Sequence, residues 1–369
     1  MKFVCSKSNL LTGVQTVAKA VPSKTTMSIL ECILIEADNG NIILTANDME
    51  LGIETIIKGD VLVSGKIALD AKIFLEIVRK LPDNDITIET DDNNKTTITC
   101  EKAKFNIIGK SGDDFSCLPV VEKRDPLVIS QYTLKESIRQ TIFSISDNEN
   151  NKLMTGELYE INNDELKVVS LDGHRISIRK IRLKNSYPFK KVVVPGKTLN
   201  EISKILSGDM DKDVLIYFSD KHIIFEFDNT TVVSRLIEGE YFKIDQMLSY
   251  DYETKVRINK KELLSCIDRA TLLVKEGDKK PIIINITDAG MELKINSAVG
   301  SMNEEIDITK QGKDLMIGFN PKFLIDALKV IEDEEIDIYL VNPKAPCFIR
   351  DEEGKYIYLI LPVNFTTVS

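Results

Sequence analysis

The chain repeats one pattern three times, at a spacing too long for small repeats. Three helix-forming segments read ALDAKIFLEIVRKL, VPGKTLNEISKIL and GFNPKFLIDALKVI, and each has a lysine near its start, at Lys72, Lys197 and Lys322. Both intervals between these lysines are 125 residues. Solenoid repeats have periods of about 20–50 residues. A period this long therefore indicates three copies of a whole domain.

Other parts of the unit repeat as well. Each copy opens with a strand and a first helix. In all three copies, the first helix has an apolar residue at one equivalent position and another one turn later, on the same face. These residues are Leu10, Leu134 and Leu263, then Val14, Ile138 and Ile267. After each second helix comes a charged turn and a strand, ITIE, VLIYF or IDIYL. Strands outnumber helices and follow one another at hairpin spacing, which predicts an α+β fold with two helices per domain packed on antiparallel sheets.

The pattern predicts six helices and three domains. We expect domains at 1–125, 126–252 and 253–369, with linkers at 117–126 and, less clearly, 242–253. Each domain is long enough to bury its own core. The expected helices are 7–20, 71–80, 133–144, 197–206, 260–272 and 320–330, and the second helix of each copy follows a cap or turn residue, Asp70, Gly196 or Asn320.

Composition excludes several classes of protein. The sequence begins MKFVCSKSNLL, without the apolar run of a signal peptide. No apolar stretch approaches the roughly 20 residues that span a bilayer. We expect a cytoplasmic protein with no membrane partner, no cofactor and no metal. The six cysteines stand far apart without a CxxC pair, which predicts buried thiols in a reducing compartment. They are Cys5, Cys32, Cys100, Cys117, Cys266 and Cys347.

The charge distribution points to a polyanionic partner, although the net charge is −10. The six expected helices contain 14 Lys and Arg against 6 Asp and Glu. One interpretation is that lysine suits helix surfaces and aspartate suits turns. The other is that the helices line one basic surface, which would neutralise phosphates without reading bases.

Geometry limits what such a surface can enclose. A compact domain of this length has a diameter of roughly 35 Å. Six such domains in a ring leave a hole of roughly 35 Å, whereas three leave almost none. A DNA duplex is about 20 Å across. One chain is therefore too small to encircle DNA, but two chains joined head to tail would do so with room for water and ions.

The densest local motif is SLDGHRISI, residues 170–178. An Asp-Gly turn between two strands precedes His174 and Arg175. Three interpretations remain open for Asp172, His174 and Arg175: a hydrolytic or metal site, a plain hairpin turn, and the rim of a binding pocket. His222 is the other histidine of the sequence, and neither a carboxylate pair nor a Gly-rich phosphate loop accompanies the motif. We therefore favour the pocket rim and expect no catalytic residues.

With this motif, the whole chain resembles the bacterial DNA sliding clamp, the β subunit of DNA polymerase III. The resemblance rests on several segments in order and at their spacings. They are the opening MKF with NLL at 9–11, SIL at 28–30, LTANDMELGIE at 44–54, DGHR, VPGK at 194–197, LIEGEYF at 236–242, IGFNPKFL at 317–324 and LILPV at 359–363.

The resemblance implies the DNA-clamp fold in three domains, closed into a ring as a head-to-tail homodimer. The ring would encircle duplex DNA topologically and nonspecifically, be loaded by a clamp loader, and tether the polymerase III catalytic subunit. It would also bind other proteins with a clamp-binding motif, such as repair polymerases and mismatch-repair proteins. This is a mobile tether that raises the local concentration of polymerase, a physical rather than chemical activity.

The resemblance also implies a hydrophobic pocket between domains 2 and 3 for a linear peptide with a Gln and a hydrophobic pair. The chain departs from the family pattern at Leu171, usually Thr, at Phe242, often Pro, at Asn151, where Arg is common, and in its NFTTVS tail. We expect His174 and Arg175 to offer polar contacts at the rim, and the chain after Pro362 to lie along it. The matching positions are Met154, Leu171, Gly173, His174, Arg175, Ile176, Phe242, Gln246, Met247, Pro346, Leu359, Ile360, Leu361, Pro362 and Val363.

Two further sets of residues follow. Lys24 stands where the family has a DNA-contacting Arg, and the repeat adds Lys72, Arg79, Lys80, Lys197 and Lys322 as DNA-facing residues. For the dimer, the segments 103–109 and 269–275 would meet across the interface by family resemblance. Phe105 and Ile107 would contact Leu272 and Leu273, while Lys102 and Lys104 would face Glu304 and Glu305.

Two alternatives from other classes stay open at this point. One is a phosphoesterase that uses Asp172, His174 and Arg175. The other is a peptide-binding scaffold that never meets DNA. A ring would stay on closed circular DNA and leave linear DNA, whereas an enzyme or a plain scaffold would show no such dependence.

Overall fold

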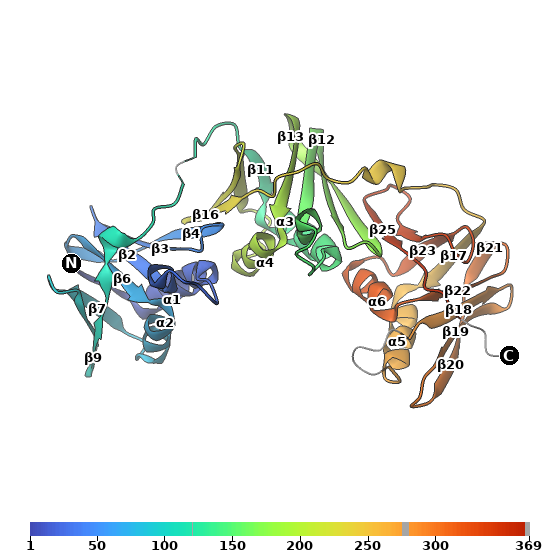
Figure 1. Ribbon diagram of the computed structural model, residues 1–369, viewed down its shortest axis with the longest axis horizontal. Helices are drawn as coiled ribbons and strands as arrows, with labels where there is room; N and C mark the ends of the chain where they lie inside the picture. Colours follow the sequence, from blue (N-terminus) through green and yellow to red (C-terminus); the bar gives the residue numbers. More distant parts are fainter. Residues whose placement is uncertain (120, 275–279, 366–369) are drawn as a thin grey trace. The chain divides into compact units, whose positions relative to one another are not determined.

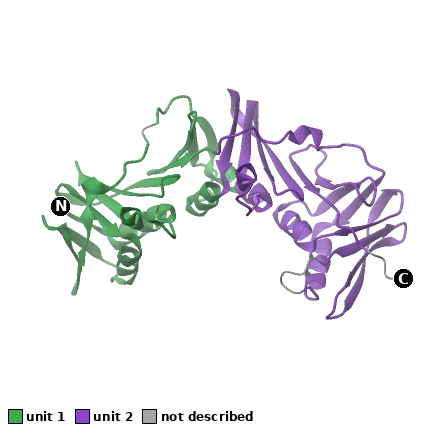
Figure 2. Cartoon of the chain, in the orientation of Figure 1, with its two compact units in different colours: residues 1–135, 197–236 green, residues 136–196, 237–369 purple. Residues whose placement is uncertain are grey.

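The computed structural model describes residues 1–119, 121–274 and 280–365. The chain divides into two compact units, residues 1–135 with 197–236, and residues 136–196 with 237–369 (Figure 2). We call them unit 1 and unit 2, and describe each by itself. In the described part of the chain, no helix is long and apolar enough to cross a membrane.

Unit 1 contains two antiparallel sheets. One has five strands in the order β5-β1-β7-β8-β9, and the other has nine in the order β10-β6-β2-β3-β4-β16-β15-β14-β11. The strands are β1 Lys2–Ser6, β2 Cys32–Asp38, β3 Asn41–Asn47, β4 Leu51–Ile57, β5 Asp60–Val63, β6 Gly65–Asp70, β7 Asp85–Thr90, β8 Lys95–Cys100, β9 Ala103–Ile108, β10 Lys110–Ser111, β11 Leu127–Ser130, β14 Asp213–Phe218, β15 His222–Phe227 and β16 Thr230–Arg235.

Unit 2 also contains two antiparallel sheets. Seven strands run in the order β12-β13-β25-β24-β23-β17-β21, and four in the order β20-β19-β18-β22. The strands are β12 Gly156–Leu171, β13 Arg175–Pro195, β17 Thr254–Asn259, β18 Ile282–Thr287, β19 Gly290–Asn296, β20 Ser301–Ile306, β21 Thr309–Gly312, β22 Leu315–Phe319, β23 Glu335–Leu340, β24 Cys347–Arg350 and β25 Tyr356–Ile360.

Six α-helices occur among the described residues, where the sequence predicts them. They are α1 Lys7–Val17, α2 Ala71–Lys80, α3 Gln131–Thr141, α4 Gly196–Ile205, α5 Lys260–Thr271 and α6 Pro321–Val330. Short 3₁₀ turns extend α1 to Ala20 and α3 to Ser144. In unit 1, α1 packs on β3 and β4 and against α2, and in unit 2 α5 packs against α6 (Figure 1).

The helix caps explain why helices begin at these points. Asp70 accepts a hydrogen bond from Ile73 N at 2.8 Å, and Asn320 accepts one from Lys322 N at 3.0 Å. Each side chain pairs a backbone donor that has no partner within the first helical turn. Pro321 follows Asn320 at the start of α6, where its missing N–H costs nothing. The predicted caps at Asp70 and Asn320 are confirmed.

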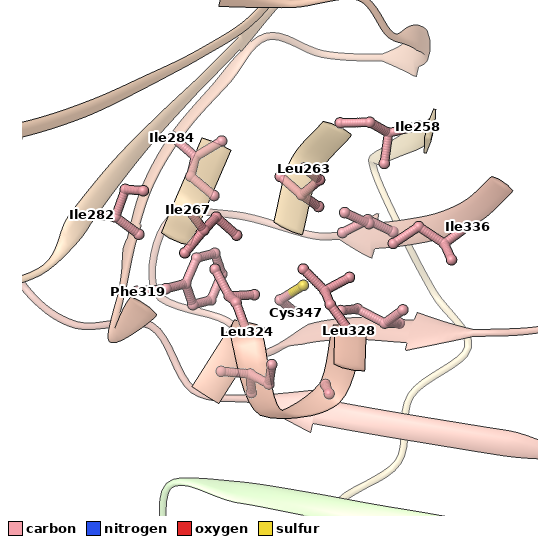
Figure 3. Packing of buried hydrophobic residues seen from close by; sticks show 14 of the residues in the cluster. Ile258, Leu263, Ile267, Ile282, Ile284, Phe319, Leu324, Leu328, Ile336 and Cys347 are labelled. Atoms are coloured by element: carbon pink, nitrogen blue, oxygen red, sulfur yellow. The ribbon is translucent and has the colours of Figure 1, made fainter. Parts of the chain in front are cut away.

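The repeated apolar positions are core positions. The side chains of Leu10, Leu134 and Leu263 are at most 1 % exposed. In unit 2, Leu263 and Ile267 of α5 pack with Leu324 and Leu328 of α6 and with Phe319 of β22 (Figure 3). Burying one such side chain contributes about 1.5–3 kcal/mol. Periodic spacing therefore fixes which helix face meets the sheets.

The cysteines fit the prediction only in part, and the first expected linker packs on unit 1. All six cysteines are free thiols, and five are buried, but Cys117 is exposed. The first linker is not a free tether, because Leu118 and Val121 pack against Tyr217 and its neighbours in unit 1. Val120 lies outside the described residues.

One buried acid stands out in unit 2. Glu157 on β12 is fully buried, and neither carboxyl oxygen has a hydrogen-bond partner in the described structure. The hydroxyl of the buried Tyr159 is likewise unpaired there. Burial raises the pKa of Glu157 to about 8, and the nearby Thr141 hydroxyl offsets part of the rise. The folded protein therefore holds this proton at neutral pH.

We predict that Glu157→Gln stabilises the protein increasingly as pH rises from about 4.5 to about 8. Between these values the unfolded chain releases a proton that the folded chain keeps, so native stability falls with rising pH. Glutamine removes that loss, which is on the order of 4 kcal/mol at pH 8. Thermal unfolding at pH 5 and pH 8 measures it. The control Glu160→Gln, on the same strand but paired with Lys167 and Lys191, should give no gain, and an equal gain at both pH values would contradict the raised pKa.

Candidate functional site

The DGHR motif forms the tight turn between β12 and β13. Asp172 Oδ1 accepts hydrogen bonds from the backbone N–H groups of His174 at 2.9 Å and Arg175 at 3.1 Å. Gly173 has φ +88°, which a residue with a Cβ rarely adopts. The Asp and Gly of the motif therefore serve the turn itself, and the hairpin interpretation is confirmed.

Arg175 is buried beneath this turn, and its side chain is only 6 % exposed. Its Nε donates to Asp172 Oδ2 at 2.9 Å, its Nη1 to Asp326 Oδ2 of α6 at 2.7 Å, and its Nη2 to the carbonyl of Phe143. The guanidinium also lies 4.5 Å from the ring centroid of Phe323. Three of the five guanidinium N–H donors are therefore used within the protein, and polar contact of Arg175 with a ligand stays a prediction.

A cavity of about 410 Å³ opens beside the turn, within unit 2. It has the size of a small-ligand or peptide site. Eleven of the fifteen expected pocket residues line it, and most are apolar. They are Met154, Leu171, Gly173, His174, Arg175, Ile176, Phe242, Met247, Pro346, Leu359 and Leu361.

The structure places the other four expected residues outside the lining. Ile360 is 1 % exposed and belongs to the core with Leu263, because successive side chains of β25 point to opposite faces of the sheet. Gln246 ends a short 3₁₀ turn, Ile244–Gln246, that precedes Met247. Pro362 and Val363 lie beyond the end of β25 and do not line the cavity.

The C-terminal segment takes a different path from the one expected. Leu361 N donates to His174 O at 2.8 Å, which ties this segment to the turn. Val363 N then donates to Gly318 O at 2.8 Å on β22, and Phe365 lies so close to Gly318 that a Cβ there would clash. The prediction that the chain after Pro362 lies along the pocket rim is therefore wrong as far as Phe365. Residues 366–369 lie outside the described residues.

The segment that carries Met247 is anchored by Arg350, which sequence reasoning missed. Arg350 donates to the carbonyls of Ser249 at 3.2 Å and Tyr250 at 3.3 Å. Its guanidinium lies 4.5 Å from the ring centroid of Tyr250 and 4.4 Å from that of Tyr339. Cation–π contacts of this kind stabilise by about 0.5–2 kcal/mol. The two carbonyls that accept from Arg350 lie about 100 residues earlier in the chain, so no local pattern indicates this contact.

The expected DNA-facing residues are exposed, yet four of the six have an acidic partner in the chain. Arg79 and Lys80 pair with Glu76, Lys197 with Asp48, and Lys322 with Asp326. Lys24 and Lys72 are also exposed. Pairs between two exposed side chains, such as Arg79–Glu76, contribute at most about 1 kcal/mol, whereas the Asp48 side chain that pairs with Lys197 is only 8 % exposed.

Most of the expected dimer residues lie on two sheet edges, one in each unit, whereas Leu272 and Leu273 directly follow helix α5. β9, with Phe105 and Ile107, is an edge of the five-stranded sheet, and β20 is an edge of the four-stranded sheet. Leu272 is 80 % exposed, and Ile108, which lies within the expected segment 103–109, is 84 % exposed. Such exposed apolar side chains beside unpaired edges are typical of an interface.

Two of the expected dimer contacts are altered by the structure. Leu273 packs partly on the core of its own unit. Glu304 forms an ion pair with Arg269 of the same chain, and this hydrogen bond lowers the pKa of Glu304. Glu304 is therefore not a free partner for Lys102 or Lys104, whereas Glu305 remains exposed. Lys275, at the end of the expected segment 269–275, lies outside the described residues.

With this geometry in view, comparison with known proteins identifies the family. Models of the DNA polymerase III beta subunit match in succession, its N-terminal domain over residues 1–119, its central domain over 128–243 and its C-terminal domain over 245–364. A curated beta sliding clamp of Staphylococcus aureus is 33 % identical over 375 residues, 99 % of each chain. The chain belongs to the DNA polymerase III beta subunit family.

Solved sliding clamps share this fold throughout. A structure described as a putative DNA polymerase III beta subunit from Eubacterium rectale has a TM-score of 0.96 and 74 % identity, and the match covers 99 % of this chain and 100 % of that one. The DNA polymerase sliding clamp of Bacillus subtilis has a TM-score of 0.95 and 34 % identity, with the same coverage. The family consists of processivity subunits that are not catalytic, so the chain is a sliding clamp that works with DNA and a DNA polymerase. The phosphoesterase alternative is set aside.

For the clamp chain we predict that Arg350→Leu loosens the segment that carries Met247. The carbonyls of Ser249 and Tyr250 lose their donor, while leucine keeps some of the apolar volume. Hydrogen exchange should quicken across residues 247–252 and stay unchanged in β24 and β25. The control Arg257→Leu removes an exposed arginine whose contact to Asp337 is 3.9 Å, and it should leave the segment protected. Equal exchange in both variants would contradict the anchoring role.

Proposed function

We propose that two copies of the chain join head to tail into a closed ring that encircles duplex DNA, and that the ring tethers the polymerase III catalytic subunit by a peptide held in the 410 Å³ cavity. In this proposal each chain contributes three domains, 1–125, 126–252 and 253–369. The observation that carries it is the apolar cavity beside the Asp172–Arg175 turn in a chain of the sliding-clamp family.

The cavity suits the apolar side chains of a linear peptide. Leu171, Ile176 and Leu359 form branched aliphatic walls, and Met154 and Met247 add flexible thioethers that adapt to different partners. His174 is exposed at the rim and would supply a polar contact there. One adaptable site would serve the polymerase, the clamp loader, repair polymerases and mismatch-repair proteins in turn.

DNA contact would be nonspecific and electrostatic. Exposed cationic groups on α2 and α6 would exchange their carboxylate partners for phosphates at small cost, because these cations stay exposed to solvent. Lys197 on α4 differs, because its partner Asp48 is only 8 % exposed. Weak, interchangeable contacts hold no register on the duplex, which favours sliding. Such a ring would work in the cytoplasm, without a cofactor.

The topology of binding tests the proposal most directly. The protein, loaded on nicked circular DNA by its clamp loader, should stay bound at high salt and be released when the circle is cut once. A peptide-binding scaffold that never encloses DNA would show no difference between circular and linear DNA, and that result would overturn the ring.

We predict that Met247→Glu weakens binding of a fluorescent polymerase-tail peptide by more than about tenfold, since it puts a charge against an apolar ligand. Met247 is 45 % exposed, so the fold should tolerate the change. Fluorescence anisotropy gives the Kd. The matched control is Met210→Glu, at an exposed methionine of unit 1, and it should leave the Kd unchanged. Equal affinity in the two variants would place the peptide elsewhere.

For the ring itself, Ile108→Lys or Leu272→Lys should give a folded monomer. Each puts a charge into an apolar contact between two sheet edges, while both side chains are exposed in the isolated chain. Sedimentation measures the mass. Leu62→Lys on β5, the opposite edge of the five-stranded sheet, should stay dimeric. A dimer that survives both interface changes would refute the proposed edges.

A further inference from the structure

Asp326 on α6 is shared by two cations. Its Oδ2 accepts a hydrogen bond from Arg175 Nη1 at 2.7 Å and another from Lys322 Nζ at 3.2 Å. The Arg175 side chain is 6 % exposed, whereas that of Lys322 is 70 % exposed. A single carboxylate oxygen thus connects a buried cation in the cavity wall with an exposed cation on a basic helix.

At the buried end, Arg175 holds the cavity wall in place. Its Nε donates a hydrogen bond to Asp172 Oδ2, and Asp172 Oδ1 accepts one from His174 N within the turn. The backbone carbonyl of His174, within this turn, accepts a hydrogen bond from Leu361 N. Since Gly173, His174 and Leu361 all line the cavity, a shift of the Arg175 guanidinium reaches both of its walls.

At the exposed end, Lys322 belongs to the residues proposed to meet DNA phosphates. A lysine that turns to a phosphate gives up its share of Asp326 Oδ2. An acceptor oxygen that loses one of two cationic donors binds the other more strongly, because the two compete for the same lone pairs and charge. Arg175 would then be held more firmly.

We propose that Asp326, which does not line the cavity, is a positioning residue of the peptide pocket, and that it links peptide binding to the engagement of Lys322 by phosphate. The inference rests on the proposed function. Because such coupling is reciprocal, DNA in the ring would tighten peptide binding and bound peptide would favour the Lys322–phosphate contact. The alternative is that Lys322 and Asp326, four residues apart, only stabilise the helix, in which case changes to them would not affect the pocket.

Peptide affinities of single variants separate the two interpretations. Asp326→Asn keeps the shape of the side chain but removes one of the two charges that balance the buried guanidinium, and should raise the Kd of the polymerase-tail peptide roughly tenfold. Asp326→Glu, which restores the charge, should recover part of that loss. Lys322→Gln should lower the Kd, by no more than about fivefold, because the pair it breaks is exposed. The control Lys329→Gln, two turns along the same helix, changes net charge equally and should have no effect.

The two histidines of the sequence supply a second readout that simple loss of stability would not move. The ring of His174 lies 6.0 Å from that of Phe323, over which Arg175 stacks, while His222 lies on β15 of unit 1. In ¹H–¹³C spectra, Lys322→Gln and Asp326→Asn should shift the His174 ring signal and leave that of His222 unchanged. Lys329→Gln should shift neither.

The outcomes are distinct. If the wild-type protein fails to bind the peptide, the proposed function is overturned and this inference with it. If the wild type binds but Asp326→Asn binds equally well, the positioning role alone is overturned. If Lys322→Gln matches Lys329→Gln in both Kd and the His174 signal, the link to the helix surface is overturned. Lys322 is exposed, so this last comparison holds even if Asp326→Asn fails to fold.

Discussion

The buried guanidinium of Arg175 is the interaction on which the candidate site depends. A charge that is 6 % exposed is stable only when paired and hydrogen-bonded on all sides. Asp172, Asp326 and the Phe143 carbonyl meet that requirement from the hairpin turn, from α6 and from the 3₁₀ turn after α3. Three segments far apart in the sequence are thereby fixed around one cavity, and removal of either carboxylate leaves the guanidinium with one anionic partner instead of two.

This arrangement also explains how, in the proposed function, one chain would combine a rigid peptide pocket with a surface that binds DNA weakly. In the pocket wall the ion pairs are buried and geometrically fixed. On the exposed face of α2 the pairs of Glu76 with Arg79 and Lys80 are solvated and contribute at most about 1 kcal/mol each. The same type of bond therefore has two uses, and burial decides which. In the proposed function, a peptide held in place and a duplex free to slide need opposite properties, and both would rest on Lys, Arg, Asp and Glu side chains.

Local patterns predicted the elements well because local chemistry determines them. The periodic Leu10, Leu134 and Leu263 fixed the buried helix faces, and Asp70 and Asn320 marked helix starts. Resemblance to the family added most of the cavity lining. What sequence reasoning missed depends on distant partners. Arg175 is buried because of Asp326, 151 residues away, and Arg350 binds a segment about 100 residues earlier. Ile360 and Val363 were assigned to the pocket although strand alternation and the contact with Gly318 take them from it.

The central claim is that the turn and the start of the C-terminal segment form one peptide site. The most direct measurement is amide hydrogen exchange of the dimer with and without the polymerase-tail peptide, followed by mass spectrometry. We expect added protection across residues 171–176 and at Leu361, with no change in β22 around Gly318. Protection confined to other segments, with 171–176 exchanging at its unbound rate, would contradict the account.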